Sequence, residues 1–197
     1  MNQLRKFDNK LSVNGEHPIL GLDEVGKGAG FGPLVVVGLI LKNNTFSDEV
    51  NDSKLLSPET RERLSKMILE NVHYCKIEAV SAKVINNIGI SQAERRAMER
   101  IDKGQNIADI ILIDGNINYL KENQVAQTLI KGDQKSFTIA CASIVAKDYR
   151  DKLVIKLASK YPGYGIEANK GYPTPKHKEA VRLLGLSDQH RREWGWN

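Results

Sequence analysis

Four acidic residues stand where the sequence predicts strands or the turns that follow them. Asp23 and Glu24 are adjacent and close the apolar stretch ILGLDE, Asp114 closes IILID, and Asp133 follows a short apolar segment in IKGD. A charge beside a core strand is costly unless a partner compensates it. Because reactive groups in sheets covered by helices collect beyond the strand ends, we expect these four side chains to meet in one crevice.

Carboxylates that share a cleft repel one another, so a cation is expected among them. No His or Cys accompanies the four acids, and a donor set made only of oxygens suits Mg²⁺ or Mn²⁺ better than zinc. Two such ions cleave phosphodiesters, one by activating water and the other by steadying the leaving oxygen. Taken singly, the Asp in IDG or in KGD is more typical of a turn. Together the four acids favour a metal site, although their spacing does not name the reaction.

A glycine-rich segment follows the first acid pair, with Gly26, Gly28, Gly30 and Gly32 at every second position. We call residues 26–32 the glycine loop. Two interpretations remain open: a hairpin between two strands, or a backbone that a ligand can approach closely. The loop lacks the GxxxxGK[ST] pattern of a P-loop and the GxGxxG pattern of a dinucleotide site.

Length and composition indicate one globular domain. The chain has 197 residues, 41% hydrophobic and 27% charged, which is enough for a full core. Its longest apolar run, PLVVVGLIL, is too short to cross a bilayer, so no membrane contact is expected. Cys75 and Cys141 stand far apart without a metal-binding motif, which predicts reduced, buried thiols and a cytoplasmic location.

The net charge of +5 comes from the end of the chain, because residues 150–197 hold ten Lys or Arg against five Asp or Glu. A basic segment on a neutral body is typical of proteins that bind a phosphate backbone. Basic tails also serve solubility, so this feature alone favours a nucleic-acid partner only modestly.

The elements that must position the acids follow from hydrophobic periodicity and capping signals. The order is strands first and then alternating helix and strand, which predicts an α/β fold with a mixed sheet and helices on its faces. The predicted strands cover residues 17–24, 34–41, 73–82, 109–115 and 125–133, and the predicted helices cover residues 57–72, 91–103, 138–161 and about 177–184.

These blocks resemble a known family. GLDEVGKGAGFGPLVV is similar to the first motif of the prokaryotic type 2 ribonucleases H, and the resemblance continues in the family's order over nearly the whole chain from Pro18 onward. The further blocks are NDSKLLSPETRERL, the GI…A…AM segment, LIDGN, IKGDQKSFTIACASIVAKDYRD, YPGYGIEANKGYPTPKH and HRREW. The chain therefore resembles ribonuclease HII.

The resemblance implies a ribonuclease H-like mixed five-stranded sheet flanked by helices, in a single domain over residues 1–197. Its core would cover about 1–150, and a basic C-terminal helical extension about 151–197. It further implies two-metal hydrolysis, with Mg²⁺ or Mn²⁺, of RNA in RNA/DNA hybrids and of ribonucleotides embedded in duplex DNA. The cut would fall 5′ of the ribonucleotide and leave 3′-hydroxyl and 5′-phosphate ends, in ribonucleotide excision repair and DNA replication. The family's metal ligands match the acids already singled out: Asp23, Glu24, Asp114 and Asp133.

The resemblance also implies substrate contacts. The backbone of Gly26, Lys27 and Gly28 would sense the ribose 2′-hydroxyl, the group that distinguishes RNA from DNA. Tyr172 would pack on the sugar at the RNA–DNA junction, although an ordinary half-buried tyrosine is the alternative. Lys54 is the first candidate for a phosphate contact.

Further cations are candidates for phosphate contacts, with an ordinary solvated lysine as the alternative for each. They are Lys147, Lys170, Lys176 and Lys178. For His177 and His190 we expect structural or phosphate-contact roles, because two-metal cleavage needs no histidine. The expected partners are the nucleic acids named above and a replication clamp, with the chain itself a monomer.

Two features depart from the family pattern and leave alternatives open. Lys27 stands where the family usually has Arg, and the FGP that follows is more typical of ribonuclease HIII, which would cut hybrids and RNA runs but not single ribonucleotides. Ribonuclease HIII carries an N-terminal substrate-binding domain, and too few residues precede the first predicted strand here to form one. A non-catalytic nucleic-acid-binding module is a weaker alternative, because all four acids are present. A DNA resolvase would not explain the KGY and GKG motifs.

Overall fold

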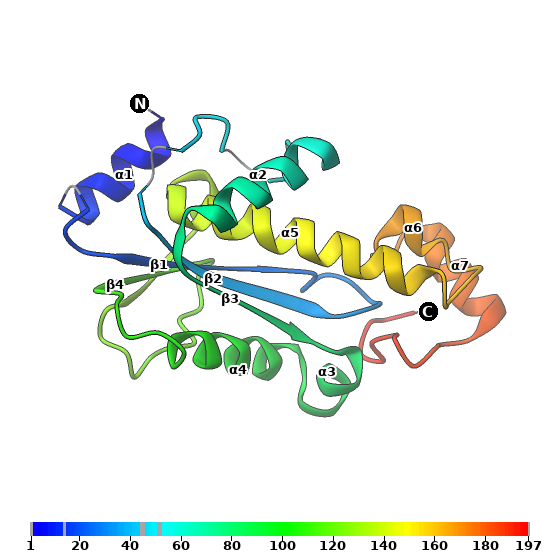
Figure 1. Ribbon diagram of the computed structural model, residues 1–197. Helices are drawn as coiled ribbons and strands as arrows, with labels where there is room; N and C mark the ends of the chain where they lie inside the picture. Colours follow the sequence, from blue (N-terminus) through cyan, green and yellow to red (C-terminus); the bar gives the residue numbers. More distant parts are fainter. Residues whose placement is uncertain (1, 14, 44–45, 51–52, 197) are drawn as a thin grey trace.

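A five-stranded mixed sheet forms the centre of the molecule. The computed structural model describes residues 2–13, 15–43, 46–50 and 53–196. The strand order is β3-β2-β1-β4-β5, in which β1 pairs antiparallel with β2 and parallel with β4 (Figure 1). The strands are β1 (Ile19–Val25), β2 (Leu34–Leu41), β3 (Val72–Val80), β4 (Ile110–Asp114) and β5 (Ala126–Leu129). The predicted α/β class with a mixed five-stranded sheet is confirmed.

Helices cover both faces of the sheet. Figure 1 shows α1, α2 and α5 on one face, α3 and α4 on the other, and α6 and α7 beyond the far end of α5. The helices are α1 (Gln3–Leu11), α2 (Pro58–Glu70), α3 (Ala82–Ile88), α4 (Ile90–Asp102), α5 (Phe137–Ala158), α6 (Ile166–Asn169) and α7 (Pro175–Leu184), with a short 3₁₀ turn η1 (Gly132–Gln134). Within the described residues, no helix has both the length and the apolar character that a membrane span requires.

The long apolar run of β2 reflects its burial on both sides. Val35 and Val37 pack into the core formed with α2 and α5, whereas Val36 and Ile40 pack into the core formed with α4. Side chains alternate between the faces of a strand, so a strand covered on both faces must be apolar at nearly every position. This explains why LVVVGLIL shows no alternation of polar and apolar residues.

Three local features differ from the sequence-based expectations. Helices α1, α3 and α6 were not predicted, and each is too short to give a clear periodic pattern. The predicted strand over residues 125–133 is divided, because β5 ends at Leu129 and Lys131 takes a left-handed conformation (φ 55°) before η1. The glycine loop does not close a tight hairpin, since residues 26–33 all separate β1 from β2.

Close packing between β2 and α4 gives a first testable prediction. A Cβ atom added at Gly38 would lie 2.8 Å from Leu22 Cδ2 and would overlap Ile101 Cγ2 as well. We expect Gly38→Ala to destabilise the protein by about 1–3 kcal/mol, because overpacking forces neighbouring groups to move. Urea unfolding measures this change. Gly195→Ala is the matched control, since a Cβ there meets nothing within 4 Å. An equal stability of the two variants would contradict the packing argument.

Candidate active site

The register of two parallel strands places Asp23 beside Asp114. Leu22 of β1 pairs with Ile113 of β4, so the next residue on each strand reaches the same level. Side chains at one level of neighbouring strands point to the same face of a sheet. That face is the one covered by α5, because a Cβ at Gly21, two residues before Asp23, would lie 2.9 Å from the backbone of Thr138.

Glu24 follows Asp23 directly, and strand alternation turns it to the face covered by α4. Its Oε1 lies 4.0 Å from Lys27 Nζ, and Lys27 Nζ lies 2.7 Å from Glu94 Oε2 on α4. Glu94 is only 2% exposed and was not singled out from the sequence, where it is one of several charged residues of an amphipathic helix. The two adjacent acids therefore stand on opposite faces at the end of β1.

Asp133 reaches the same region from η1 and not from a strand end, which corrects the expectation for this residue. It is 3% exposed. The amide of Gly132 donates a hydrogen bond of 2.6 Å to Asp114 Oδ1, and this bond fixes η1 against the end of β4. Lys54 Nζ donates to Asp133 Oδ2 at 3.3 Å, so the predicted phosphate-binding lysine lies at the acids themselves.

The acids repel one another, and their pKa values show it. Burial and the charge of Asp114 raise the pKa of Asp23 to about 7. Burial, Asp23 and Glu94 raise the pKa of Glu24 to about 8. Burial and the charge of Asp133 also raise the pKa of Asp114. A cation placed among these groups would offset the free-energy cost of burying the carboxylates and of their mutual repulsion.

The donor set fits a hard divalent cation, since its members supply only carboxylate oxygens. In the described part of the chain, no three His, Cys, Asp or Glu side chains are close enough together to enclose an ion. An ion held by these acids would therefore need further ligands from outside the protein. Such a site suits Mg²⁺, which usually keeps waters and substrate phosphate oxygens among its ligands.

Two serines that sequence reasoning missed tie the acids to the surrounding loops. The hydroxyl of Ser143, on α5, hydrogen-bonds the Asp23 carboxylate. Ser143 Oγ also lies 2.9 Å from Ser53 Oγ, next to Lys54. Arg61 holds this loop, with Nε donating to the Ser53 carbonyl at 3.2 Å. The signal that could have revealed Ser143 is a buried hydroxyl in the apolar helix segment ACASIVA.

Tyr172 and Lys147, both predicted to bind substrate, lie in different surroundings. Tyr172 lies beside the glycine loop, because a Cβ at Gly28 would be 3.8 Å from its Cε1 atom. Lys147 does not join the acids in the described structure. Its Nζ donates to Asp151 Oδ1 at 2.8 Å, one helical turn along α5. The two residues are four positions apart on a helix that the sequence predicted, so helical spacing could have revealed this pair.

His177 and His190 form a buried pair that connects two segments of the C-terminal region. Their Nε2 atoms lie 3.2 Å apart, while His177 Nδ1 lies 2.9 Å from the Tyr172 carbonyl oxygen. The Ser187 amide donates to His190 Nδ1 at 2.9 Å. Burial and the neighbouring His177 lower the pKa of His190 to about 4, so both rings are neutral at pH 7. The pair holds the carbonyl of Tyr172 in place.

Comparison with known proteins assigns this arrangement to a family. A sequence profile described as Ribonuclease HII matches residues 20–196. The chain belongs to the ribonuclease HII family. Ribonuclease HII of Ruegeria pomeroyi is 42% identical over 190 residues, covering 96% of this chain and 81% of its own. Ribonuclease HII of Alkaliphilus metalliredigens is 41% identical, covering 98% and 97%. The predicted enzyme class, a metal-dependent endoribonuclease of ribonuclease H type 2, is thereby confirmed.

Solved structures share the fold. The ribonuclease HII of Archaeoglobus fulgidus, solved in a complex with PCNA, aligns with a TM-score of 0.77 at 24% identity, over 90% of this chain and 95% of its own. Bst-RNase HIII, solved in complex with Mn²⁺, aligns with a TM-score of 0.65 at 20% identity, over 86% of this chain and 63% of its own. At these identities the likeness concerns the fold alone. It confirms the predicted ribonuclease H-like architecture.

The raised pKa of Asp23 gives a prediction about stability. Between pH 3.8 and about 7, the folded protein keeps a proton on Asp23 that the unfolded chain has already lost. Stability should therefore fall as the pH rises through that window. At pH 8 in EDTA, we expect Asp23→Asn to be more stable than the wild type by on the order of 1–3 kcal/mol.

Urea unfolding at pH 5 and pH 8 tests this prediction, and the advantage of Asp23→Asn should shrink at the lower pH. Glu122→Gln, at an exposed position, is the matched control and should leave the midpoint unchanged at both values. A variant less stable than the wild type at pH 8 would show that Asp23 is not repelled by its neighbours.

Proposed function

We propose that this enzyme hydrolyses RNA paired to DNA, and also cuts at single ribonucleotides embedded in duplex DNA. The cut falls on the 5′ side of the ribonucleotide and leaves 3′-hydroxyl and 5′-phosphate ends. One observation carries the proposal: Asp23 and Asp114 stand side by side on parallel strands, with Asp133 close enough for its charge to act on both. Family membership supports the ribonuclease H activity.

Asp23, Asp114 and Asp133 would hold divalent ions from the α5 side of the sheet, with Glu24 at the strand end. Mg²⁺ or Mn²⁺, bound in pairs with the substrate, supplies an activated water and stabilises the leaving oxygen. The chain's own residues orient these ligands. Ser143 fixes the Asp23 carboxylate, and the Gly132 amide fixes that of Asp114.

The substrate's cutting position would be set by the glycine loop and Tyr172. Their proximity supports contact of both with one sugar, whose 2′-hydroxyl would be the group available for recognition there. Lys54, whose side chain is 74% exposed, would follow the phosphate backbone from the side of Asp133. For Lys147, which Asp151 already engages, a phosphate contact stays a prediction.

Cleavage at single ribonucleotides is favoured over a ribonuclease HIII-like specificity by the position of Lys27. Its ammonium group faces Glu94 and Glu24 on the α4 side. The exchange of Arg for Lys therefore alters a side chain and leaves the loop backbone in place. Recognition through backbone amides does not depend on that side chain.

A panel of duplexes tests the function. The substrates are an RNA/DNA hybrid, a DNA duplex with one ribonucleotide, and an all-DNA duplex of the same sequence, each with Mg²⁺ and then Mn²⁺. We expect cleavage of the first two and none of the third. Cleavage of the hybrid alone would replace the proposal with the ribonuclease HIII-like specificity, and cleavage of all three would end it.

Removal of one acid should stop cleavage without stopping binding. We expect Asp23→Asn and Asp114→Asn each to lower kcat by about 1,000-fold or more, because each removes charge from the groups that act on the transition state. Hybrid binding should persist in gel-shift assays. Asp109→Asn, at the exposed opposite end of β4, is the control and should cleave normally. Turnover by the wild type in excess EDTA would contradict the role of these acids.

For partners and location, we propose a monomer in the cytoplasm that contacts a replication clamp. Free Cys75 and Cys141 support a reducing compartment. The PCNA complex of the Archaeoglobus fulgidus enzyme supports the clamp contact by analogy.

A further inference from the structure

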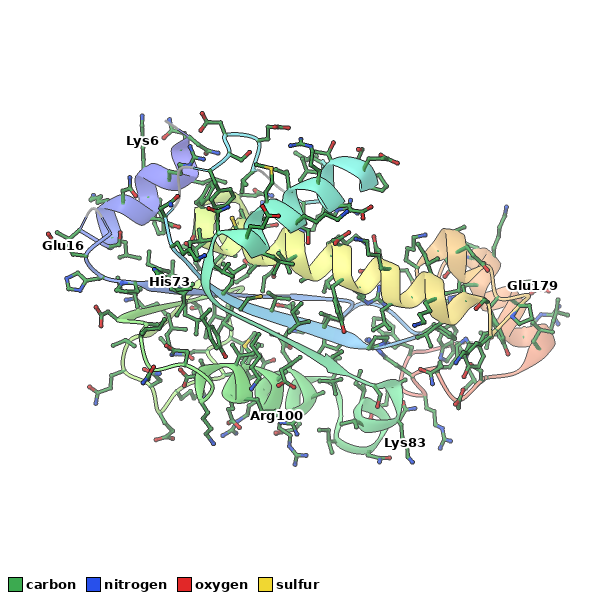
Figure 2. The ribbon with its side chains drawn as sticks, viewed as in Figure 1. Lys6, Glu16, His73, Lys83, Arg100 and Glu179 are labelled. Atoms are coloured by element: carbon green, nitrogen blue, oxygen red, sulfur yellow. The ribbon has the colours of Figure 1, made fainter. Side chains whose placement is uncertain are left out.

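Two buried arginines lie beneath the glycine loop. Arg150 on α5 is 0% exposed, and Arg191 in the segment after α7 is 1% exposed. Neither forms an ion pair with a carboxylate in the part of the chain that the structure describes. Ordinary charged residues such as Lys83 and Arg100 project from the periphery instead (Figure 2). Burial and the charge of Arg150 lower the pKa of Arg191 to about 9, so hydrogen bonds must compensate both guanidinium groups.

The guanidinium of Arg191 bonds to the two ends of the glycine loop. Nε and Nη2 donate to the Gly32 carbonyl oxygen at 3.1 and 3.0 Å. Nη1 donates to the carbonyl oxygens of Gly26 at 2.6 Å and of Lys27 at 3.2 Å. All three nitrogens of the planar group thus serve the loop backbone, an arrangement that a lysine could not reproduce.

These bonds decide which way the loop amides point. Across a trans peptide bond the C=O and N–H groups point in opposite directions. With the Gly26 and Lys27 carbonyls turned inward to Arg191, the amides of Lys27 and Gly28 face outward. Within the described residues neither amide has a hydrogen-bond partner in the protein, and Gly28 is exposed. Tyr172 lies near this part of the loop, since its Cε1 atom is 3.8 Å from a Cβ placed on Gly28.

Arg150 braces the same assembly. Its guanidinium donates to the carbonyl oxygens of Pro33 at 3.0 Å and Phe31 at 3.2 Å. It also donates to the carbonyl oxygen of Lys170, two residues before Tyr172, at 3.0 Å. Its guanidinium lies 5.5 Å from the centroid of the Tyr172 ring, within the range of a cation–π contact. The loop and the segment that carries Tyr172 are therefore joined through one side chain.

We propose that Arg191, braced by Arg150, is the positioning residue that turns the Lys27 and Gly28 amides outward and so gives the enzyme its preference for ribose over deoxyribose. This inference rests on the proposed function, in which the glycine loop senses the 2′-hydroxyl. The guanidinium of Arg191 donates to loop carbonyls, so its loss should reduce discrimination between sugars more than affinity for the phosphate backbone, which every duplex shares.

The test measures binding of two duplexes of identical sequence, one all-DNA and one with a single ribonucleotide. The full chain carries Asp23→Asn, so that neither duplex is cut in Mg²⁺. We expect Arg191→Gln to lower the ratio of the two affinities by about tenfold, the factor expected for the loss of one hydrogen bond. The neighbouring exposed Arg192→Gln makes the same change of charge and should leave the ratio intact. An unchanged ratio in Arg191→Gln would overturn the inference.

A second measurement keeps the inference testable if Arg191→Gln does not fold. In the Asp23→Asn chain with Arg191 intact, amide NMR follows Lys27 and Gly28. We expect both signals to shift and gain protection from hydrogen exchange with the ribonucleotide duplex, but not with the all-DNA duplex. Equal responses to the two duplexes would refute the outward amides as the ribose sensor.

Wild-type cleavage separates this inference from the proposed function. If the wild type cuts neither the hybrid nor the ribonucleotide duplex, the function itself fails. If the wild type cuts both while Arg191→Gln discriminates as well as the parent chain, only the role of Arg191 fails.

Discussion

Repulsion between buried carboxylates is the constraint on which the arrangement of this molecule depends. The register of β1 against β4 brings Asp23 and Asp114 to one level, where burial and the charge of Asp114 raise the pKa of Asp23, and burial and the charge of Asp133 raise that of Asp114. Each acid is held by a group from a distant segment: the Ser143 hydroxyl for the first, the Gly132 amide for the second. Two apolar cores, one on each face of the sheet, supply the stability that keeps these charges in place.

The alternation of a β-strand gives the adjacent acids separate surroundings. Asp23 belongs to the α5 face with Ser143, whereas Glu24 belongs to the α4 face with Lys27 and Glu94. One dipeptide thereby connects the acids to the loop that follows the strand. The glycine loop in turn is held by Arg191, from the segment after α7, and by Arg150 of α5, the helix that also carries Ser143.

The sequence predicted the sheet and the helices α2, α4, α5 and α7, and it pointed to the acids near the strand ends, because these depend on local patterns: apolar runs, capping signals and charges next to strands. It could not place α1, α3 and α6, which are too short to show a period. It also missed Glu94, Ser143 and Arg191. Their roles come from contacts between segments far apart in sequence, and no local pattern encodes which partner such a side chain will meet.

The glycine loop and Arg191, whose guanidinium binds its carbonyls, lie far apart in the chain, and this has a consequence for biosynthesis. Arg191 follows Gly26 by 165 residues. At about 5–20 residues per second, a ribosome needs on the order of 10–30 s to reach it. During that interval the loop carbonyls lack the guanidinium group of Arg191, although the four acids near the strand ends have already been made. If Arg191 acts as proposed, a newly translated copy can select between sugars only after nearly the whole chain has been made.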